Sequence, residues 1–265
     1  MPELPEVETE RGRLAERLAG RRIAAAAIDD PRLTRPEDPV LVAAELHGRR
    51  AEAVERRGKY LLVRLDDGAV LLVHLRMTGG FRYAEATHER AVLELDDGTR
   101  IAYRDLRRFG TWLLLDGDEL EPYLAERLGP EPLGRAFTTG FLARRLAGRR
   151  APVKAALLDQ RTVAGLGNIY ADESLWHAGV HPLRPAGSLT AEEVGRLRAG
   201  IRKALRTGIR RQGADLGDGA YAGGRMQHEF RVYGRLGEPC DRCGGPIEKT
   251  RAGGRGTWYC PACQA

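Results

Sequence analysis

Residues 240–263 read CDRCGGPIEKTRAGGRGTWYCPAC and contain all four cysteines of the chain. Their spacing is Cys240-x2-Cys243-x16-Cys260-x2-Cys263. Each Cys-x2-Cys folds as a tight turn that presents two thiolates, and two such turns at the ends of a hairpin close a tetrahedral site. The pattern predicts one structural zinc ion, because four protein ligands leave no open coordination position. A redox pair or disulfides are the alternatives.

The segment between the two cysteine pairs contains Gly253-Gly254-Arg255-Gly256-Thr257, at the expected tip of the hairpin. Glycines there let the backbone approach a partner closely, and the planar guanidinium of Arg255 suits a phosphate. A zinc hairpin alone does not decide the function, since many such modules bind only proteins.

The chain before this module changes from β-rich to helical. Short apolar runs predict strands at 59–65, 69–75, 91–95 and 111–115. Asp-Asp-Gly at 66–68 and 96–98 falls between such runs and predicts two hairpin turns. Helices are expected at 7–18, 118–128, 138–146, 153–159, 169–177 and 190–207.

These elements predict an α+β multidomain protein. We expect a β-rich domain at 1–116, a helical domain at 117–235 and the cysteine module at 236–265. Residues 213–225 hold five glycines in 13 positions and predict a mobile loop before the last module.

Composition narrows the class of protein but not its function. The 265 residues are 42% hydrophobic and 30% charged, which fits a folded two-domain protein and excludes a disordered chain. No apolar run reaches the length of a membrane helix, and the N-terminus lacks a signal peptide, so we expect a cytoplasmic protein without membrane contact. The net charge of +6 admits a polyanionic partner without establishing one, because the charges are interspersed.

Two further segments contain candidate functional groups, one for nucleophilic attack and one for phosphate binding. Pro2, once Met1 is removed, is a secondary amine that can attack an aldehyde-level carbon, with Glu3 and Glu6 beside it. Gly165 and Gly167 precede a helix start at Asn168, whose free N–H groups suit a phosphate. A structural N-terminus and an ordinary capped helix are the alternatives.

Seven segments occur in one order along the chain and carry a resemblance. They are MPELPEVET at 1–9, RRGKYLL with Lys59, HLRMTG with Met77, RDLRRFG with Arg107 and Phe109, GLGNIYADE, QHEFRVYGR and the cysteine module. Together the segments resemble the formamidopyrimidine-DNA glycosylases, bacterial enzymes that excise 8-oxoguanine and cleave abasic sites.

The resemblance implies a fold and a partner. It predicts an N-terminal β-sandwich, a helix–two-turn–helix domain and a zinc finger, acting as a monomer near the bacterial nucleoid. Damaged double-stranded DNA would bind in the cleft between the domains. The activity implied is that of a bifunctional DNA glycosylase and abasic-site lyase for oxidised purines.

The resemblance also implies roles for individual residues. Pro2 matches the nucleophile that attacks C1′, Glu3 the acid that assists sugar ring opening and Glu6 a supporting carboxylate. Lys59 matches the proton donor in β-elimination, and Arg255 the arginine that clamps the phosphates flanking the lesion.

A second set of residues matches DNA contacts of the family. Met77, Arg107 and Phe109 match the trio that fills the gap left by the extruded base, as the cost of lost stacking requires. The positions that match contacts to the DNA backbone are His74, His88, Arg149, Lys154, Asn168 and Tyr233.

Two departures from the family pattern leave alternatives open. Leu106 stands where proline is usual, and the loop that would close over the flipped base is unusually rich in glycine. One alternative is an endonuclease VIII-like enzyme for oxidised pyrimidines. The other is a damaged-DNA-binding protein without catalysis, against which the joint presence of Pro2, Glu3 and Lys59 argues.

Overall fold

The computed structural model describes residues 1–216 and 221–265 and divides into two compact units. Unit 1 comprises Met1–Ala125 with Ala214–Gly224, and unit 2 comprises Glu126–Gly213 with Arg225–Ala265. Four residues of the expected mobile loop, 217–220, lie outside the described residues. The three-domain boundaries drawn from the sequence stay a prediction. No helix of the described residues is long and apolar enough to cross a bilayer.

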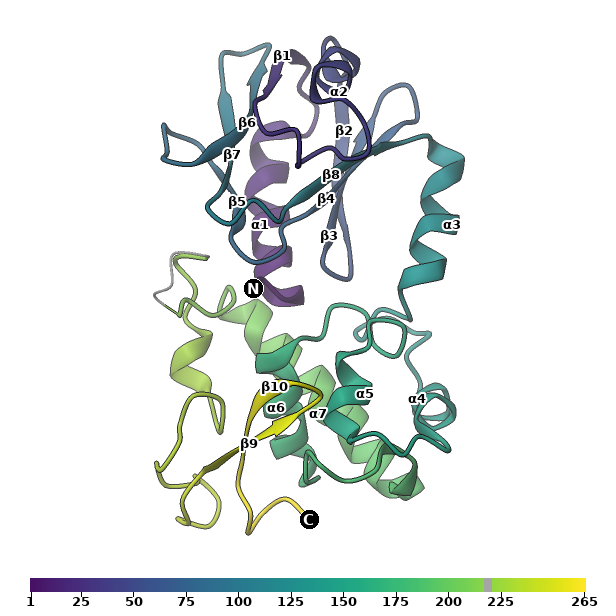
Figure 1. Ribbon diagram of the computed structural model, residues 1–265, viewed down its shortest axis with the longest axis vertical. Helices are drawn as coiled ribbons and strands as arrows, with labels where there is room; N and C mark the ends of the chain where they lie inside the picture. Colours follow the sequence, from purple (N-terminus) through teal and green to yellow (C-terminus); the bar gives the residue numbers. More distant parts are fainter. Residues whose placement is uncertain (217–220) are drawn as a thin grey trace. The chain divides into compact units, whose positions relative to one another are not determined.

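Unit 1 is built around two antiparallel four-stranded sheets (Figure 1). The first has the order β1-β6-β7-β5, with strands Ile23–Ile28, Glu89–Leu95, Arg100–Asp105 and Gly79–Arg82. The second has the order β2-β3-β4-β8, with strands Ala51–Arg57, Tyr60–Leu65, Val70–His74 and Thr111–Leu115. Three helices accompany the sheets: α1 (Leu4–Leu18), α2 (Pro39–Leu46) and α3 (Gly117–Arg127), the last of which ends in unit 2.

A single hydrophobic core joins the two sheets. Leu93 and Tyr103 of the first sheet, Val63 and Trp112 of the second, and Leu14 of α1 belong to it, and each is at most 2% exposed. Burial of such side chains from both sheets supplies the main driving force for folding of unit 1. The expected sandwich is therefore confirmed.

The two Asp-Asp-Gly segments form the predicted hairpin turns. Gly68 and Gly98 both have left-handed φ angles, +89° and +82°, that glycine adopts at little cost. Their N–H groups donate to the carbonyls of Leu65 and Leu95, each over 3.0 Å. The turns join β3 to β4 and β6 to β7.

The first helix starts earlier than the expected residue 7. Glu3 is the N-cap of α1 and Pro5 lies in its first turn, where proline is tolerated because the N–H groups there have no partner within the helix. Helix α2 was not expected; the Asp38 side chain caps it by accepting the Val40 N–H over 2.8 Å.

Unit 2 is helical and includes the cysteine module. Its α-helices are α4 (Thr139–Leu146), α5 (Val153–Leu158), α6 (Asn168–Ala178) and α7 (Ala191–Arg210), with 3-10 turns η1 (Ala186–Ser188) and η2 (Met226–Glu229). They confirm the expected helices to within three residues at each end. Helix α6 packs along α7, and Thr190 and Glu193 form a capping box at the start of α7.

The cysteine module folds as a hairpin of β9 (Glu248–Ala252) and β10 (Arg255–Tyr259), which packs on α6 (Figure 1). Gly253 and Gly254 form its two-residue tip with φ angles of +55° and +75°, the geometry that matches the twist of a tight hairpin. A Cβ on Gly253 would lie 3.0 Å from Ala155 Cβ, so glycine also lets the tip approach α5.

The contact between α6 and α7 allows a matched test. A Cβ at Gly200 would lie 2.5 Å from the Ser174 carbonyl oxygen, whereas at Gly195 of the same helix nothing lies within 4 Å. We expect Gly200→Ala to lower the free energy of unfolding by about 1–3 kcal/mol. Gly195→Ala should raise it by about 0.5–1 kcal/mol through helix propensity. Urea unfolding of both variants checks this, and equal effects would contradict the packing described.

Candidate active site and nucleic-acid-binding residues

The start of α1 gathers the proposed nucleophile and its two carboxylates. Pro2, Glu3 and Glu6 are all buried, with both glutamates only 2% exposed. Glu6 Oε2 accepts the Glu3 N–H over 2.8 Å, and its Oε1 accepts the Ala214 N–H over 2.8 Å. Glu6 thus joins the N-terminus to the beginning of the glycine-rich segment, a link that its role as a supporting carboxylate did not foretell.

Lys59 occupies a two-residue turn between β2 and β3. Arg57 pairs with Tyr60 across this turn, and Gly58 takes a φ of +59°, which a type II′ hairpin requires at its first central position. The Lys59 side chain is only 5% exposed, unusual for a lysine at a hairpin tip. The residue as a whole is thus largely shielded from solvent.

His74 lies beside Lys59 and is neutral. Burial, and then the positive charges of Arg76 and Lys59, lower the pKa of His74 to about 3. Its Nδ1 accepts the Arg76 N–H over 2.9 Å, so the neutral ring carries its proton on Nε2. His74 can therefore donate one hydrogen bond to an anion but brings no charge.

The Met77 loop and the Arg107–Phe109 loop are held together by one buried carboxylate. Asp105 is 1% exposed; it accepts the Thr78 hydroxyl, the Arg107 N–H over 3.2 Å and the Gly110 N–H over 2.7 Å. Arg107 N–H also donates to Thr78 Oγ1 over 3.0 Å. These bonds connect the two loops that carry the trio expected to fill the vacated base position.

The trio itself is presented outward. Phe109 is 51% exposed, Arg107 is exposed and Met77 is half-buried. The Arg107 guanidinium carbon lies 4.8 Å from the Phe109 ring centroid, a cation–π distance. An exposed phenylalanine has no role in the core, and this distinguishes Phe109 from a packing residue. Leu106, at the departure from the family pattern, is 47% exposed and fills no packed position.

A salt bridge and two glycines fix the backbone around this trio. Arg108 has a left-handed φ of +58° and binds both oxygens of Asp30, over 2.6 and 2.7 Å. The Arg108 hydrogen bond holds the pKa of Asp30 below its usual value. A Cβ on Gly79 or Gly110 would lie within 2.1 Å of the Tyr103 hydroxyl, so glycine is required at both positions.

In unit 2, helix α6 holds two other segments through its polar side chains. Asn168 Nδ2 donates to the Gly256 carbonyl over 3.1 Å, and Asp172 accepts the Trp258 N–H over 3.1 Å. Glu173, 1% exposed, accepts the N–H groups of residues 231–233 over 3.0–3.1 Å. The GLGNIYADE motif therefore positions both the finger hairpin and the segment that contains Tyr233.

Lys154, which the resemblance matches to a DNA-backbone contact, is completely buried. Its side chain is 0% exposed, and its ammonium contacts Asp172 Oδ1 at 2.8 Å, the Gly256 carbonyl at 2.8 Å and Thr257 Oγ1 at 2.9 Å. Burial raises the pKa of Asp172 to about 7, partly offset by Lys154. Lys154 thus supports the hairpin from within, and its match to a backbone contact of the family stays a prediction.

The remaining candidates of unit 2 lie at or near the surface. Arg255 is exposed at the first position of β10, beside the two-glycine tip. Tyr233 is half-buried, with its ring 4.6 Å from that of Trp258. Arg149 forms an ion pair with Asp159 at 3.3 Å. In unit 1, His88 is exposed and has a φ of +63°.

The four cysteines form a site of the size that a tetrahedral metal requires. Their Sγ atoms lie within 4.8 Å of one another, with Cys240 and Cys263 at 3.9 Å and Cys243 and Cys260 at 3.5 Å. Ligands at about 2.3 Å from a tetrahedral zinc are about 3.8 Å apart, which these distances bracket. The donor set and its geometry fit a structural metal ion.

The sequence analysis missed several residues, most of them acidic, that position the site. Thr78 and Asp105, Asp30, Asp172 and Glu173 all hold a functional loop or strand. Most lie inside the quoted motifs, so their signal was an acid within an otherwise apolar or basic segment.

Two packed sheets, followed by helices that support a hairpin with a four-cysteine cluster, define a multidomain α+β class of protein with a C-terminal cysteine finger. Three family models match this chain: the formamidopyrimidine-DNA glycosylase N-terminal domain over residues 1–112, the formamidopyrimidine-DNA glycosylase H2TH domain over 128–218, and the zinc finger found in FPG and IleRS over 237–265.

Individual relatives agree. The formamidopyrimidine-DNA glycosylases of Symbiobacterium thermophilum and Chloroflexus aggregans are each 48% identical to this chain; the matches cover all of it and 89% and 98% of those proteins. The crystal structure of MutM (Fpg) from Thermus thermophilus superposes with a TM-score of 0.90 at 45% identity, over 99% of this chain and 98% of the other. The structure of Lactococcus lactis Fpg in complex with Fapy-dG-containing DNA superposes with a TM-score of 0.92 at 37% identity, over 99% of both chains.

The chain belongs to the formamidopyrimidine-DNA glycosylase family. It is a DNA glycosylase of base excision repair, with an N-terminal sheet domain, a helical H2TH domain and a C-terminal zinc finger.

The buried Lys154–Asp172 pair yields a prediction about stability. Lys154→Met leaves an uncompensated buried carboxylate and should lower the free energy of unfolding by about 3–5 kcal/mol. The double change Lys154→Met with Asp172→Leu should recover most of that loss, because it removes both charges. Lys203→Met, at an exposed position, should change the free energy of unfolding by about 0.5 kcal/mol or less. Denaturant unfolding measures all three, and a Lys154→Met chain as stable as the Lys203→Met chain would contradict the role assigned to the pair.

Proposed function

We propose that this glycosylase excises oxidised purines from duplex DNA and then cleaves the resulting abasic site as a lyase. The observation that carries the proposal is the buried group at the start of α1, where Pro2 adjoins Glu3 and Glu3 is bonded to Glu6. The Lactococcus lactis relative was crystallised with DNA containing Fapy-dG and with DNA containing an abasic site, which supports a purine lesion as the substrate.

The reaction begins once Met1 has been removed. The Pro2 nitrogen attacks C1′ and the damaged base leaves with the electrons of the glycosidic bond. Glu3 delivers a proton to O4′ as the sugar ring opens, which leaves an iminium between Pro2 and C1′. An N-terminal amine is a weaker base than the amine of a lysine side chain, so it loses its proton more readily and can act as a nucleophile.

The iminium is an electron sink for two eliminations. Loss of a C2′ proton expels the 3′ phosphate, and a second elimination expels the 5′ phosphate. Lys59 is the proton carrier of the first step in this scheme, since its amine can exchange a proton whereas a guanidinium cannot. Arg255 acts by electrostatic clamping of the flanking phosphates.

The other site residues bind the DNA. Met77, Arg107 and Phe109 occupy the space of the extruded base, supported by Asp105. His74 offers its Nε2–H to a phosphate, and His88, Arg149, Asn168 and Tyr233 complete the proposed backbone contacts. The metal of the four-cysteine site is zinc in this proposal, held by Cys240, Cys243, Cys260 and Cys263; it fixes the fold of the finger and takes no part in the chemistry.

Covalent trapping tests the lyase step. Borohydride should reduce the iminium and attach the Met1-processed chain to a duplex that contains 8-oxoguanine opposite cytosine. A matched chain with an uncleaved N-terminal extension should bind the same DNA without being trapped, because its Pro2 nitrogen is an amide. Intact mass establishes the processing. Bound DNA with no covalent adduct from the processed chain would refute the mechanism, and preferential trapping on thymine glycol would favour the endonuclease VIII-like alternative.

Arg107 separates base extrusion from strand cleavage. We expect Arg107→Ala to slow excision by roughly 30- to 150-fold, equivalent to about 2–3 kcal/mol, because the vacated base position is left unfilled. Cleavage of a ready-made abasic site should change much less, since no base need be extruded. Leu106→Ala in the same loop is the control and should leave both rates near the wild-type values. Equal losses in the two single-turnover assays would remove the proposed role of Arg107.

A further inference from the structure

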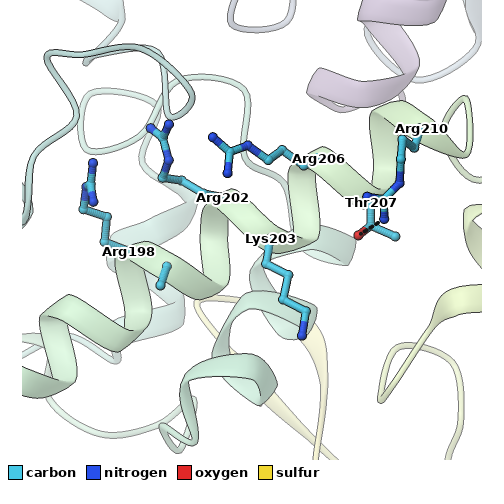
Figure 2. A pocket seen from close by; sticks show the side chains of 7 residues that line it. Arg198, Arg202, Lys203, Arg206, Thr207 and Arg210 are labelled. Atoms are coloured by element: carbon cyan, nitrogen blue, oxygen red, sulfur yellow. Dashed lines mark hydrogen bonds between the residues drawn. The ribbon is translucent and has the colours of Figure 1, made fainter.

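The outward face of α7 carries a run of cations outside every site described above. Arg198, Arg202 and Arg206 recur at four-residue intervals, and Lys203 and Arg210 lie next to them on the helix. Figure 2 shows Arg198, Arg202 and Arg206 extending from the same side of α7. We call these five residues the α7 basic face. They line a surface pocket of about 430 Å³.

The opposite side of α7 explains why these residues point outward. Leu197, Ile201 and Leu205 are completely buried, and this side packs along α6. Lys203, Arg206 and Arg210 are exposed, and Arg198 and Arg202 are half-buried. The basic face is therefore the solvent side of an amphipathic helix whose other side is committed to the fold.

The charges of the α7 basic face are uncompensated. Among the described residues, none of its five members forms an ion pair with a carboxylate, whereas the flanking Arg196 and Arg211 pair with Glu192 and Glu229. Burial and the positive charges of Arg206 and Arg198 lower the pKa of Arg202. Like charges held this close repel one another, and a bound anion would relieve the repulsion.

Two arginines of the face are held in place by the loop between α3 and α4. Arg198 Nε donates to the Phe137 carbonyl over 2.6 Å, and Arg202 Nη1 donates to the Pro132 carbonyl over 2.9 Å. A guanidinium has five N–H donors, so both keep donors for a ligand. Fixed side chains lose less conformational entropy on binding than free ones.

The lining identifies the class of anion. Among the described residues, the lining consists of the five cations with Ala199 and Thr207, so it offers no large apolar or aromatic anchor of the kind that protein partners use. Binding of a nucleic-acid backbone needs no such anchor, because phosphate neutralisation and counterion release supply the affinity. The rise from Arg198 to Arg210 is about 18 Å, comparable to about five base-pair steps of one DNA strand.

We propose that the α7 basic face is an additional, sequence-independent binding surface for the phosphate backbone of duplex DNA, separate from the residues that act on the lesion. The proposal rests on DNA being the partner of this enzyme. Such a surface adds salt-dependent affinity for undamaged DNA, which an enzyme must hold while it searches for a lesion.

The test removes the three exposed cations of the face and keeps Arg198 and Arg202, which donate to the loop between α3 and α4. In the face variant, Lys203, Arg206 and Arg210 are all changed to Gln; in the control variant, Arg21, Arg22 and Arg64 of unit 1 are changed to Gln. Both lower the net charge by three, but each control arginine is already paired with an acid. Fluorescence anisotropy then measures affinity for an undamaged duplex of about 30 base pairs as salt is raised.

We expect the logarithmic salt slope of the face variant to be shallower than that of the control by about 2–3, since each lost phosphate contact removes about 0.9. Single-turnover excision at saturating enzyme should match the wild type. A face variant with the control's slope would overturn the proposal. The proposal would also be overturned if the face variant lost binding to an acidic peptide such as hexa-aspartate while its binding to the duplex stayed unchanged. That outcome would make the face a protein-docking surface.

Two further measurements separate a lost phosphate contact from a folding defect, and the α7 proposal from the lyase mechanism. If the thermal unfolding of the face variant shows lost structure, Arg206→Gln alone should still reduce the slope by about 0.9, and an unchanged slope would overturn the proposal. Borohydride trapping of the wild type reports on the lyase chemistry alone. Trapping with no change of slope refutes only the α7 proposal, whereas a changed slope without trapping refutes only the lyase mechanism.

Discussion

The buried pair of Lys154 and Asp172 is the interaction on which unit 2 most depends. Removing two charges from water costs several kcal/mol per ion, and the pair is tolerable only because further polar contacts accompany it. Lys154 also binds the Gly256 carbonyl and Thr257 Oγ1, and Asp172 also accepts the Trp258 N–H. An apolar pair would cost less, but it would not fix β10 in register. The pair therefore determines where Arg255, at the start of that strand, is presented.

Buried carboxylates also accept backbone N–H groups in other segments of the proposed site that lack regular structure. Glu173 accepts three consecutive N–H groups of residues 231–233, Asp105 connects the loops of Met77 and Phe109, and Glu6 joins the N-terminus to Ala214. Backbone groups in such loops have no sheet or helix partner, and leaving them unpaired in the interior costs about 1–3 kcal/mol each. A carboxylate with two oxygens satisfies several of them at once. Residues proposed to contact DNA thus lie on loops whose backbone is held by hydrogen bonds to buried carboxylates.

Much of this arrangement could be predicted from the sequence, and the failures have physical causes. Periodicity and the Asp-Asp-Gly turns located β3, β4, β6 and β8, and the cysteine spacing located the metal site, whereas β1, β2, β5 and β7 were not predicted. Pattern alone could not show that Lys154 is buried, because a lysine beside arginines has the same local sequence whether it faces solvent or an aspartate 18 positions away. Asp105 was missed for the same reason: its partner Thr78 becomes a neighbour only when β5 pairs with β7. Contacts of this kind depend on tertiary structure, which local signals do not encode.

Arginine and lysine residues have different roles in this fold, depending on whether a carboxylate pairs with them. The chain has a net charge of +6, and its arginines and lysines look interchangeable in composition. In the structure Arg108 holds a loop by binding Asp30, and Lys154 lies in the interior beside Asp172. The five cations of the α7 basic face, in contrast, have no carboxylate partner among the described residues, so five positive charges are concentrated on one side of one helix. An electrostatic field that attracts DNA depends on such unpaired charges, because a paired cation contributes little beyond its partner. The location of unpaired cations is therefore a better guide to nucleic-acid contacts than the net charge.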